Sequence, residues 1–159
     1  MYNELTVKVK DIFDKKFVSI SPDATIYDAV KLIFGAGHSG LPVTTGKKHH
    51  LVGFITDQDI TADMFPSVKD FMEDYVHAHD FEAMEKKIKP VLKKKVKDVM
   101  SKRVVSIHLE DPVLKAEAIM KVKDVRRLPV VDDDKNLLGM VSKRDIFKAL
   151  VRPELRGFK

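Results

Sequence analysis

The sequence predicts an α+β fold made of two similar units that pack as a pair. Three observations lead to this prediction. A series of motifs that begins at residue 9 recurs in the same order from residue 96, each copy combines strand-like and helix-like hydrophobic patterns, and a separate helical pattern lies between the copies. The chain has 159 residues, of which 44% are hydrophobic, so it is long enough for one or two modest cores.

The repeat consists of short segments that return after 87 residues, or after 86 beyond a turn that is one residue shorter in the second copy. The matching pairs are Val9–Phe13 with Val96–Met100, Val18–Ile20 with Val105–Ile107, Leu41–Val43 with Leu128–Val130, and Gly53–Thr56 with Gly139–Ser142. Two copies are too few for a solenoid. We therefore expect a first domain at residues 8–65, a helical connector or insertion at 66–94, and a second domain at 95–151.

The first half of each copy predicts a strand followed by a helix. Phe17 to Ile20 is a short β-branched run that ends in a turn, and apolar residues at helical spacing follow it. Asp23 or Thr25 is available to cap this helix. In the second copy, Asp111 is the expected cap and Pro112 the expected first-turn residue, where its missing N–H costs nothing.

The second half of each copy predicts two neighbouring strands and a final helix. In the first copy the strands cover residues 41–44 and 51–55, and the helix begins near Thr56 or Asp57. The corresponding helix of the second copy begins near Ser142 or Lys143. The resulting order is strand, helix, strand, strand, helix. One such unit is marginal alone, so we expect the two copies to bury apolar surface against each other.

The connector has its own pattern. Helical spacing predicts two amphipathic helices that break near residues 77–80. The stretch from Lys86 to Lys97 is rich in lysine, which favours a solvated helix face over a phosphate-binding cradle.

A hydroxyl and a carboxylate stand three residues apart at the start of each final helix. These pairs are Thr56 with Asp59 and Ser142 with Asp145. The spacing matches a capping box, which satisfies free backbone N–H groups. The same groups could instead hold a phosphate at the positive helix end and accept both hydroxyls of a ribose. From the spacing alone we favour the helix cap.

The full set of motifs, repeated in order over about three quarters of the chain, resembles the CBS domain, and the two copies resemble a Bateman module. The resemblance implies a tandem pair of domains with pseudo-twofold symmetry and two clefts for adenosyl ligands such as AMP, ADP, ATP or S-adenosylmethionine. It also implies that such pairs commonly form homodimers.

The resemblance implies roles for particular residues. Asp59 and Asp145 match ribose-binding aspartates, with Thr56 and Ser142 near the ribose or phosphate. The residues that match the apolar walls around adenine are Ile20, Pro42, Ile107 and Pro129. The residues before the Leu-Pro-Val strand commonly reach phosphates in the family, and in the second copy they are Arg126 and Arg127.

The two clefts are predicted to differ. The second copy adds Lys143 and Arg144 at its helix start, and these cations attract phosphate. The first copy has Ser39-Gly40 in place of the arginine pair and a carboxylate at Asp57. A ligand rich in phosphate should therefore favour the cleft of the second copy.

Several function classes are disfavoured. The chain has no cysteine, which removes thiolate nucleophiles, disulfides and cysteine metal sites. No nucleophile–base pair, Walker loop or metal triad is present, so we expect no enzyme, no catalytic residue and no metal site. His77 and His79 could chelate a metal but point to different sides of a helix. No secretory signal or membrane span is predicted, so we expect a cytoplasmic protein with no membrane contact.

The preferred hypothesis is a stand-alone sensor that binds an adenine nucleotide as a regulatory ligand and signals to its own dimer contact or to an unidentified protein. The sequence does not choose among AMP, ADP, ATP, NAD and S-adenosylmethionine, or decide whether magnesium is needed. A nucleic-acid-binding module is one alternative, because the net charge is +5 and the pI about 9.3. A ligand-free structural or adaptor module is the other.

Overall fold

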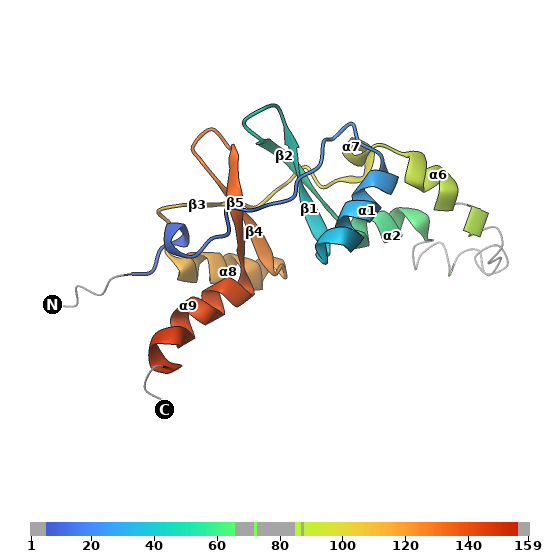
Figure 1. The fold of residues 1–159 in the computed structure, drawn as a ribbon. Coiled ribbons are helices and arrows are strands. Elements are labelled where there is room, and N and C mark those ends of the chain that lie inside the picture. The colour runs from blue at the N-terminus through green and yellow to red at the C-terminus, as the bar shows by residue number, and fades with distance from the viewer. Residues whose placement is uncertain (1–5, 66–71, 73–84, 87, 156–159) are drawn as a thin grey trace. The chain divides into compact units, whose positions relative to one another are not determined.

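The computed structural model describes residues 6–65, 72, 85–86 and 88–155 (Figure 1). The chain forms two compact units. The second-copy unit contains the chain from Val105 onward, together with the segment that ends at Phe17 and residues 46–51; the first-copy unit contains residues 18–45 and 52–104. Among the described residues, no helix combines the length and the apolar character that a membrane crossing requires.

The first-copy unit is built on a two-stranded sheet. Its elements are β1 (Gly40–Thr45), β2 (His50–Thr56, of which residues 52–56 belong to this unit), α1 (Ile26–Ala36), α2 (Asp57–Met64), α6 (Ile88–Lys93) and α7 (Val96–Val99). Thr25 caps α1 through a reciprocal pair of bonds with Asp28, so Thr25 is the cap of the two candidates that the sequence offered. Ile26, Ile33, Leu41 and Ile55 are fully or almost fully buried in the core between the helices and the sheet.

The second-copy unit is built on a three-stranded sheet in the order β3-β4-β5. Its elements are η1 (Val9–Asp11), β3 (Ile107–His108), α8 (Val113–Lys123), β4 (Arg127–Val131), β5 (Leu137–Ser142) and α9 (Lys143–Leu155). β3 and β4 are parallel, and β4 and β5 are antiparallel. Alternate residues of β4 and β5 face α8 and α9, and the core consists of Val9, Ile107, Val113, Ala116, Met120, Leu128, Val130, Val141 and Ile146.

The short segment that begins each copy of the repeat packs in the unit of the other copy. We call residues 7–14 the N-terminal segment. Although it begins the first copy, its Val9 is 0% exposed in the core of the second-copy unit, and the Val9 amide donates to the Asp111 carbonyl at 2.9 Å. Val96 is likewise 0% exposed, and its amide donates to the Ala24 carbonyl at 2.8 Å in the first-copy unit. A compact unit is therefore not one continuous stretch of sequence.

Two local predictions are wrong. The run from Phe17 to Ile20 forms only an isolated parallel bridge between Ile20 and Val43, because only Ile20 reaches the ladder of β1. Pro112 is the N-cap of α8 and lies outside its first turn, since its extended ψ of 145° delays the helix to Val113. Asp111 does not cap α8, because its carboxylate accepts from the His108 amide and from the Lys115 ammonium.

The connector is described only in part. The predicted helix break at residues 77–80, and the histidine pair within it, lie outside the described residues. α6 falls within the second predicted helix. In the lysine-rich stretch, Lys94 pairs with Asp63 at 2.7 Å and Lys97 with Asp23 at 3.3 Å, so these two ammonium groups take part in exposed ion pairs.

Candidate functional site

Both hydroxyl–carboxylate pairs form capping boxes. The Thr56 amide donates to Oδ2 of Asp59 at 2.9 Å, and the Asp59 amide donates to Oγ1 of Thr56 at 3.1 Å. The Ser142 amide donates to Oδ2 of Asp145 at 3.1 Å, and the Asp145 amide donates to Oγ of Ser142 at 3.0 Å. The helix-capping role predicted from the spacing is therefore present in both copies.

The second-copy unit brings part of the predicted phosphate and ribose set together. Arg127, the first residue of β4, lies opposite Ser142, the last residue of β5. The Lys143 amide donates to the Arg126 carbonyl at 2.9 Å, which ties the start of α9 to the chain that enters β4. The capping carboxylate of Asp145 thus lies at the same end of the sheet as the arginine pair.

The Arg127 guanidinium is half-buried, and the charges of Asp14 and Asp145 reach it. Burial lowers the pKa of Arg127, while the negative charges of Asp14 and Asp145 act in the opposite direction. Within the described residues Arg127 makes no ion pair as short as 4 Å, so neither carboxylate neutralises it through direct contact. A half-buried cation with donors still available is suited to bind an anionic group of a ligand.

Lys143 and Arg144, the first two residues of α9, border a groove between α8 and α9. With Glu117 of α8 they border a hollow of about 510 Å³, whose apolar lining is Ile146, Phe147 and Leu150. The Lys143 ammonium is 3.7 Å from the Glu117 carboxylate. The four predicted phosphate-binding residues are therefore divided between the start of β4 and the groove between α8 and α9.

The first-copy unit has the same backbone connection without the cations. The Asp57 amide donates to the Ser39 carbonyl at 2.8 Å, as Lys143 does to Arg126. Gly40 stands where the second copy has Arg127, and a Cβ there would lie 2.7 Å from Cε1 of Phe54 and 2.9 Å from the Ile55 carbonyl oxygen. The close approach of β1 to β2 thus leaves no room for a side chain at this position.

The four predicted adenine-wall residues are all buried. Ile20 is 5% exposed and Ile107 0% exposed, and Pro42 and Pro129 are buried within β1 and β4. Each isoleucine is joined to its neighbouring Leu-Pro-Val strand by parallel pairing. The structure therefore places each wall pair side by side, at covered positions of the fold.

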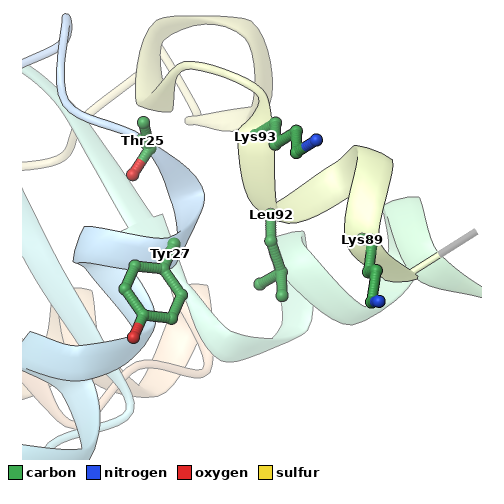
Figure 2. Close-up of a pocket in the computed structure, with 5 residues that line it drawn as sticks. All are labelled: Thr25, Tyr27, Lys89, Leu92 and Lys93. Atoms are coloured by element: carbon green, nitrogen blue, oxygen red, sulfur yellow. The ribbon is translucent and has the colours of Figure 1, made fainter.

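A second hollow, of about 440 Å³, lies between α1 and α6 in the first-copy unit (Figure 2). Its lining consists of Thr25, Tyr27, Lys89, Leu92 and Lys93. Figure 2 shows the Tyr27 ring and Leu92 on facing sides, with both ammonium groups on the α6 side. This hollow contains none of the residues that the sequence assigned to a ligand site.

Sequence reasoning missed Asp14, which shares the electrostatic surroundings of Arg127. The repeat shows only that the two copies differ at both positions. Asp14 corresponds to Ser101 after the same displacement of 87 residues, just as Arg127 corresponds to Gly40. Asp14 belongs to the first copy and Arg127 to the second, and the structure brings both residues into the second-copy unit.

Comparison with known families identifies two regions of this chain. The CBS domain family matches residues 9–64 and 96–152. The curated relatives include three proteins of Methanocaldococcus jannaschii. Uncharacterized protein MJ1426 is 32% identical, with 90% of both chains covered. Uncharacterized protein MJ1232 is 29% identical over 91% of this chain and 40% of its own, and an inosine-5'-monophosphate dehydrogenase is 32% identical over 92% and 24%. The chain thus spans less than half of the latter two relatives.

Solved structures share the fold. The CBS domain pair of protein MJ0100, in complex with 5'-methylthioadenosine and S-adenosyl-L-methionine, has a TM-score of 0.66 at 24% identity and covers 93% of this chain and 98% of its own. CBSX2, a protein of Arabidopsis thaliana, was solved in complex with AMP; it has a TM-score of 0.69 at 24% identity, with 92% and 98% covered. At these identities the likeness shows that the fold is that of a CBS pair.

Proposed function

This chain belongs to the CBS domain family, and we propose that it is a regulatory module that binds an adenosyl ligand at the start of its final helices. The proposal names a binding role and not a catalytic one. The related MJ0100 was solved with S-adenosylmethionine and 5'-methylthioadenosine and the related CBSX2 with AMP, and we extend the binding of such a ligand to this chain.

The observation that carries the proposal is that the capping box occupies only one of the two oxygens of the Asp145 carboxylate. Only Oδ2 takes part in the capping box, and Oδ1 has no hydrogen-bond partner among the described residues. Capping and ligand binding therefore do not compete for the same oxygen. A carboxylate oriented by its own backbone can accept a ribose hydroxyl with its second oxygen, and the half-buried Arg127 guanidinium supplies a cation at the same end of the sheet.

The same geometry supports a difference between the two copies. The second-copy unit has Arg127 beside its cap, whereas Gly40 leaves the first-copy unit with no side chain at that position. We therefore assign the phosphate-bearing ligand to the second-copy unit, with Asp145 and Ser142 near the ribose. The first-copy unit, with Asp59 and Thr56, suits an adenosyl ligand that carries less negative charge.

The regulatory mechanism that we propose is linkage. A ligand shifts a conformational or assembly equilibrium only as far as it binds one state more tightly than another. The state that responds is a homodimer or a complex with a regulated protein. A second copy of this chain suits the groove between α8 and α9, because Phe147 is 66% and Leu150 42% exposed there. A twofold contact would also let Glu117 of each copy meet Arg144 of the other.

Calorimetric titration of AMP, ADP, ATP and S-adenosylmethionine tests the binding proposal. Asp145→Ala removes charge-assisted hydrogen bonds worth roughly 1.5–3 kcal/mol, so we expect the affinity to fall by about 10- to 150-fold. Asp28→Ala is the matched control, because Asp28 forms the same kind of capping box with Thr25 on α1, outside the predicted ligand sites. This control loses a helix cap and should keep the affinity of the unmodified chain.

Two results would contradict the proposal. If none of the four ligands binds the unmodified chain, the capping boxes are structural and an adaptor role remains. If Asp145→Ala and Asp28→Ala lower the affinity equally, the loss reflects general destabilisation and Asp145 does not touch the ligand.

A further inference from the structure

Asp14 lies at the edge of the sheet that carries the second-copy site. Its amide donates to the Met140 carbonyl at 2.8 Å, and the Met140 amide donates to the Asp14 carbonyl at 2.9 Å. Met140 and Ser142 are alternate residues of β5, so their side chains point to the same face of the sheet, and Arg127 lies opposite Ser142. The N-terminal segment therefore brings a carboxylate to the side of β5 that lies away from β4, near the end where Arg127 stands.

Backbone packing fixes this position of Asp14. A Cβ at Gly139 would collide with the Asp14 carbonyl oxygen and would lie 2.7 Å from Cδ2 of Phe13, so the N-terminal segment crosses β5 directly above a glycine. The Asp14 side chain accepts one local bond, from the Lys16 amide to Oδ1 at 2.9 Å. Its charge is not cancelled by an ion pair within the described part of the chain.

The charges of Asp14 and Arg127 occur together in the second-copy unit, and the equivalent positions of the first-copy unit carry neither. In the first-copy unit the residue that pairs with β2 at the equivalent position is Ser101, whose amide donates to the Phe54 carbonyl at 2.9 Å. The residue equivalent to Arg127 there is Gly40. The backbone arrangement is the same in both units, so the aspartate is not needed to make the bridge. Its presence only beside the arginine points to a role in the electrostatics of the site.

We propose that Asp14 is a specificity-determining residue of the second-copy ligand site, where it offsets the positive charge that Arg127 presents and so limits the preference of the site for phosphate. This inference rests on the proposed function. Asp14 does not bind the ligand itself. Asp14 instead reduces the gain in affinity that each added phosphate gives. A phosphate near Arg127 is attracted by the guanidinium and repelled by the two carboxylates, Asp14 and Asp145.

The test compares ligands that differ only in phosphate. Affinities for adenosine, AMP and ATP are measured by calorimetry at low ionic strength, where charge effects are least screened. Asp14→Asn keeps an oxygen for the Lys16 amide and leaves the backbone bridge intact. We expect the ratio of AMP affinity to adenosine affinity to rise on the order of 3- to 10-fold, and the ratio for ATP to rise further, while adenosine affinity stays the same.

Three further variants make the result decisive. Asp14→Glu restores the charge and should return the ratio toward that of the unmodified chain. Asp133→Asn removes the same charge from an exposed residue of the same unit and should leave the ratio unchanged. Asp14→Ser, which carries the residue of the other copy, repeats the test if the asparagine variant does not fold.

Unchanged ratios in Asp14→Asn and Asp14→Ser would overturn the inference, as would an equal rise in Asp133→Asn, because the effect would then come from net charge. Both outcomes leave the proposed function intact if the unmodified chain binds AMP. Failure of the unmodified chain to bind any of these three ligands, ADP or S-adenosylmethionine would instead remove the proposed function and this inference together.

Discussion

Glu110 is the acceptor of two lysine ammonium groups from the N-terminal segment. Lys8 and Lys10 lie 2.7 and 2.9 Å from its carboxylate oxygens. Hydrogen bonds from Lys8 and then Lys10 lower the pKa of Glu110 from 4.5 to about 2. The unfolded chain therefore binds more protons in this range, so the stability that Glu110 contributes is present above about pH 4.5 and is lost as the pH falls toward 2.

We predict that Glu110→Gln weakens the acid sensitivity of the second-copy unit. The thermal midpoint of the unmodified chain should fall more steeply between about pH 5 and pH 3 than that of Glu110→Gln. The effect should be small, because the ion pairs are exposed, and it should shrink with added salt. If the thermal midpoints of the two proteins fall equally as the pH is lowered, the lysines do not hold the N-terminal segment through Glu110.

Gly139 is required by the close approach of the N-terminal segment. Gly139→Ala places a methyl group against the Asp14 carbonyl oxygen and the Phe13 ring, so we expect a loss of roughly 1–3 kcal/mol in the free energy of unfolding. Gly35→Ala is the control, because Gly35 lies in α1 with open space around it, and alanine there should stabilise by roughly 0.5–1 kcal/mol. Urea unfolding measures both free energies, and equal effects of the two substitutions would contradict close packing of the N-terminal segment on Gly139.

At the scale of elements, the exchange of short segments makes a reciprocal prediction. Val9 and Val96 are both 0% exposed, and each stands in the core of the unit formed by the other copy. Val9→Ala should cost part of the roughly 1.5–3 kcal/mol that burying a valine contributes, and it should lower the hydrogen-exchange protection of β4 and β5. Val96→Ala should instead lower the hydrogen-exchange protection of β1 and α1.

The hydrogen-exchange pattern decides this prediction directly. Protection lost in β1 on Val9→Ala, with β4 and β5 unchanged, would mean that the N-terminal segment packs on its own copy. Because the two variants make the same chemical change at equivalent positions of the repeat, each serves as the control for the other.

At the scale of the whole molecule, exposed apolar residues on the second-copy unit predict self-association. Phe147→Asp places a charge in the groove between α8 and α9 and should shift the chain from dimer toward monomer in sedimentation velocity. Lys148→Asp changes the charge at the next residue, which faces a different side of α9, and should leave association unchanged. A chain that sediments as a monomer before any substitution would exclude the proposed dimer.

Much of the local structure was predictable because its causes are local. The pairs Thr56 with Asp59 and Ser142 with Asp145 are three residues apart, so a hydroxyl and a carboxylate at that spacing can satisfy the first turn of a helix without help from other parts of the chain. The strand at 17–20 failed for the opposite reason, since a strand exists only where a neighbouring strand offers its backbone groups.

The sequence by itself determined the duplication, the helix, strand, strand, helix order that both copies share, the final helix starts and the family. The tertiary structure alone decided that Val9 and Val96 belong to the units of the opposite copies, that Lys143 faces Glu117 and not the start of β4, and that Asp14 stands near Arg127. Some of the residues in these contacts are more than a hundred positions apart in the chain. Spacing rules describe neighbours on one helix or strand, whereas such long-range pairs are set by how the chain crosses its own sheet, which depends on packing over the whole unit.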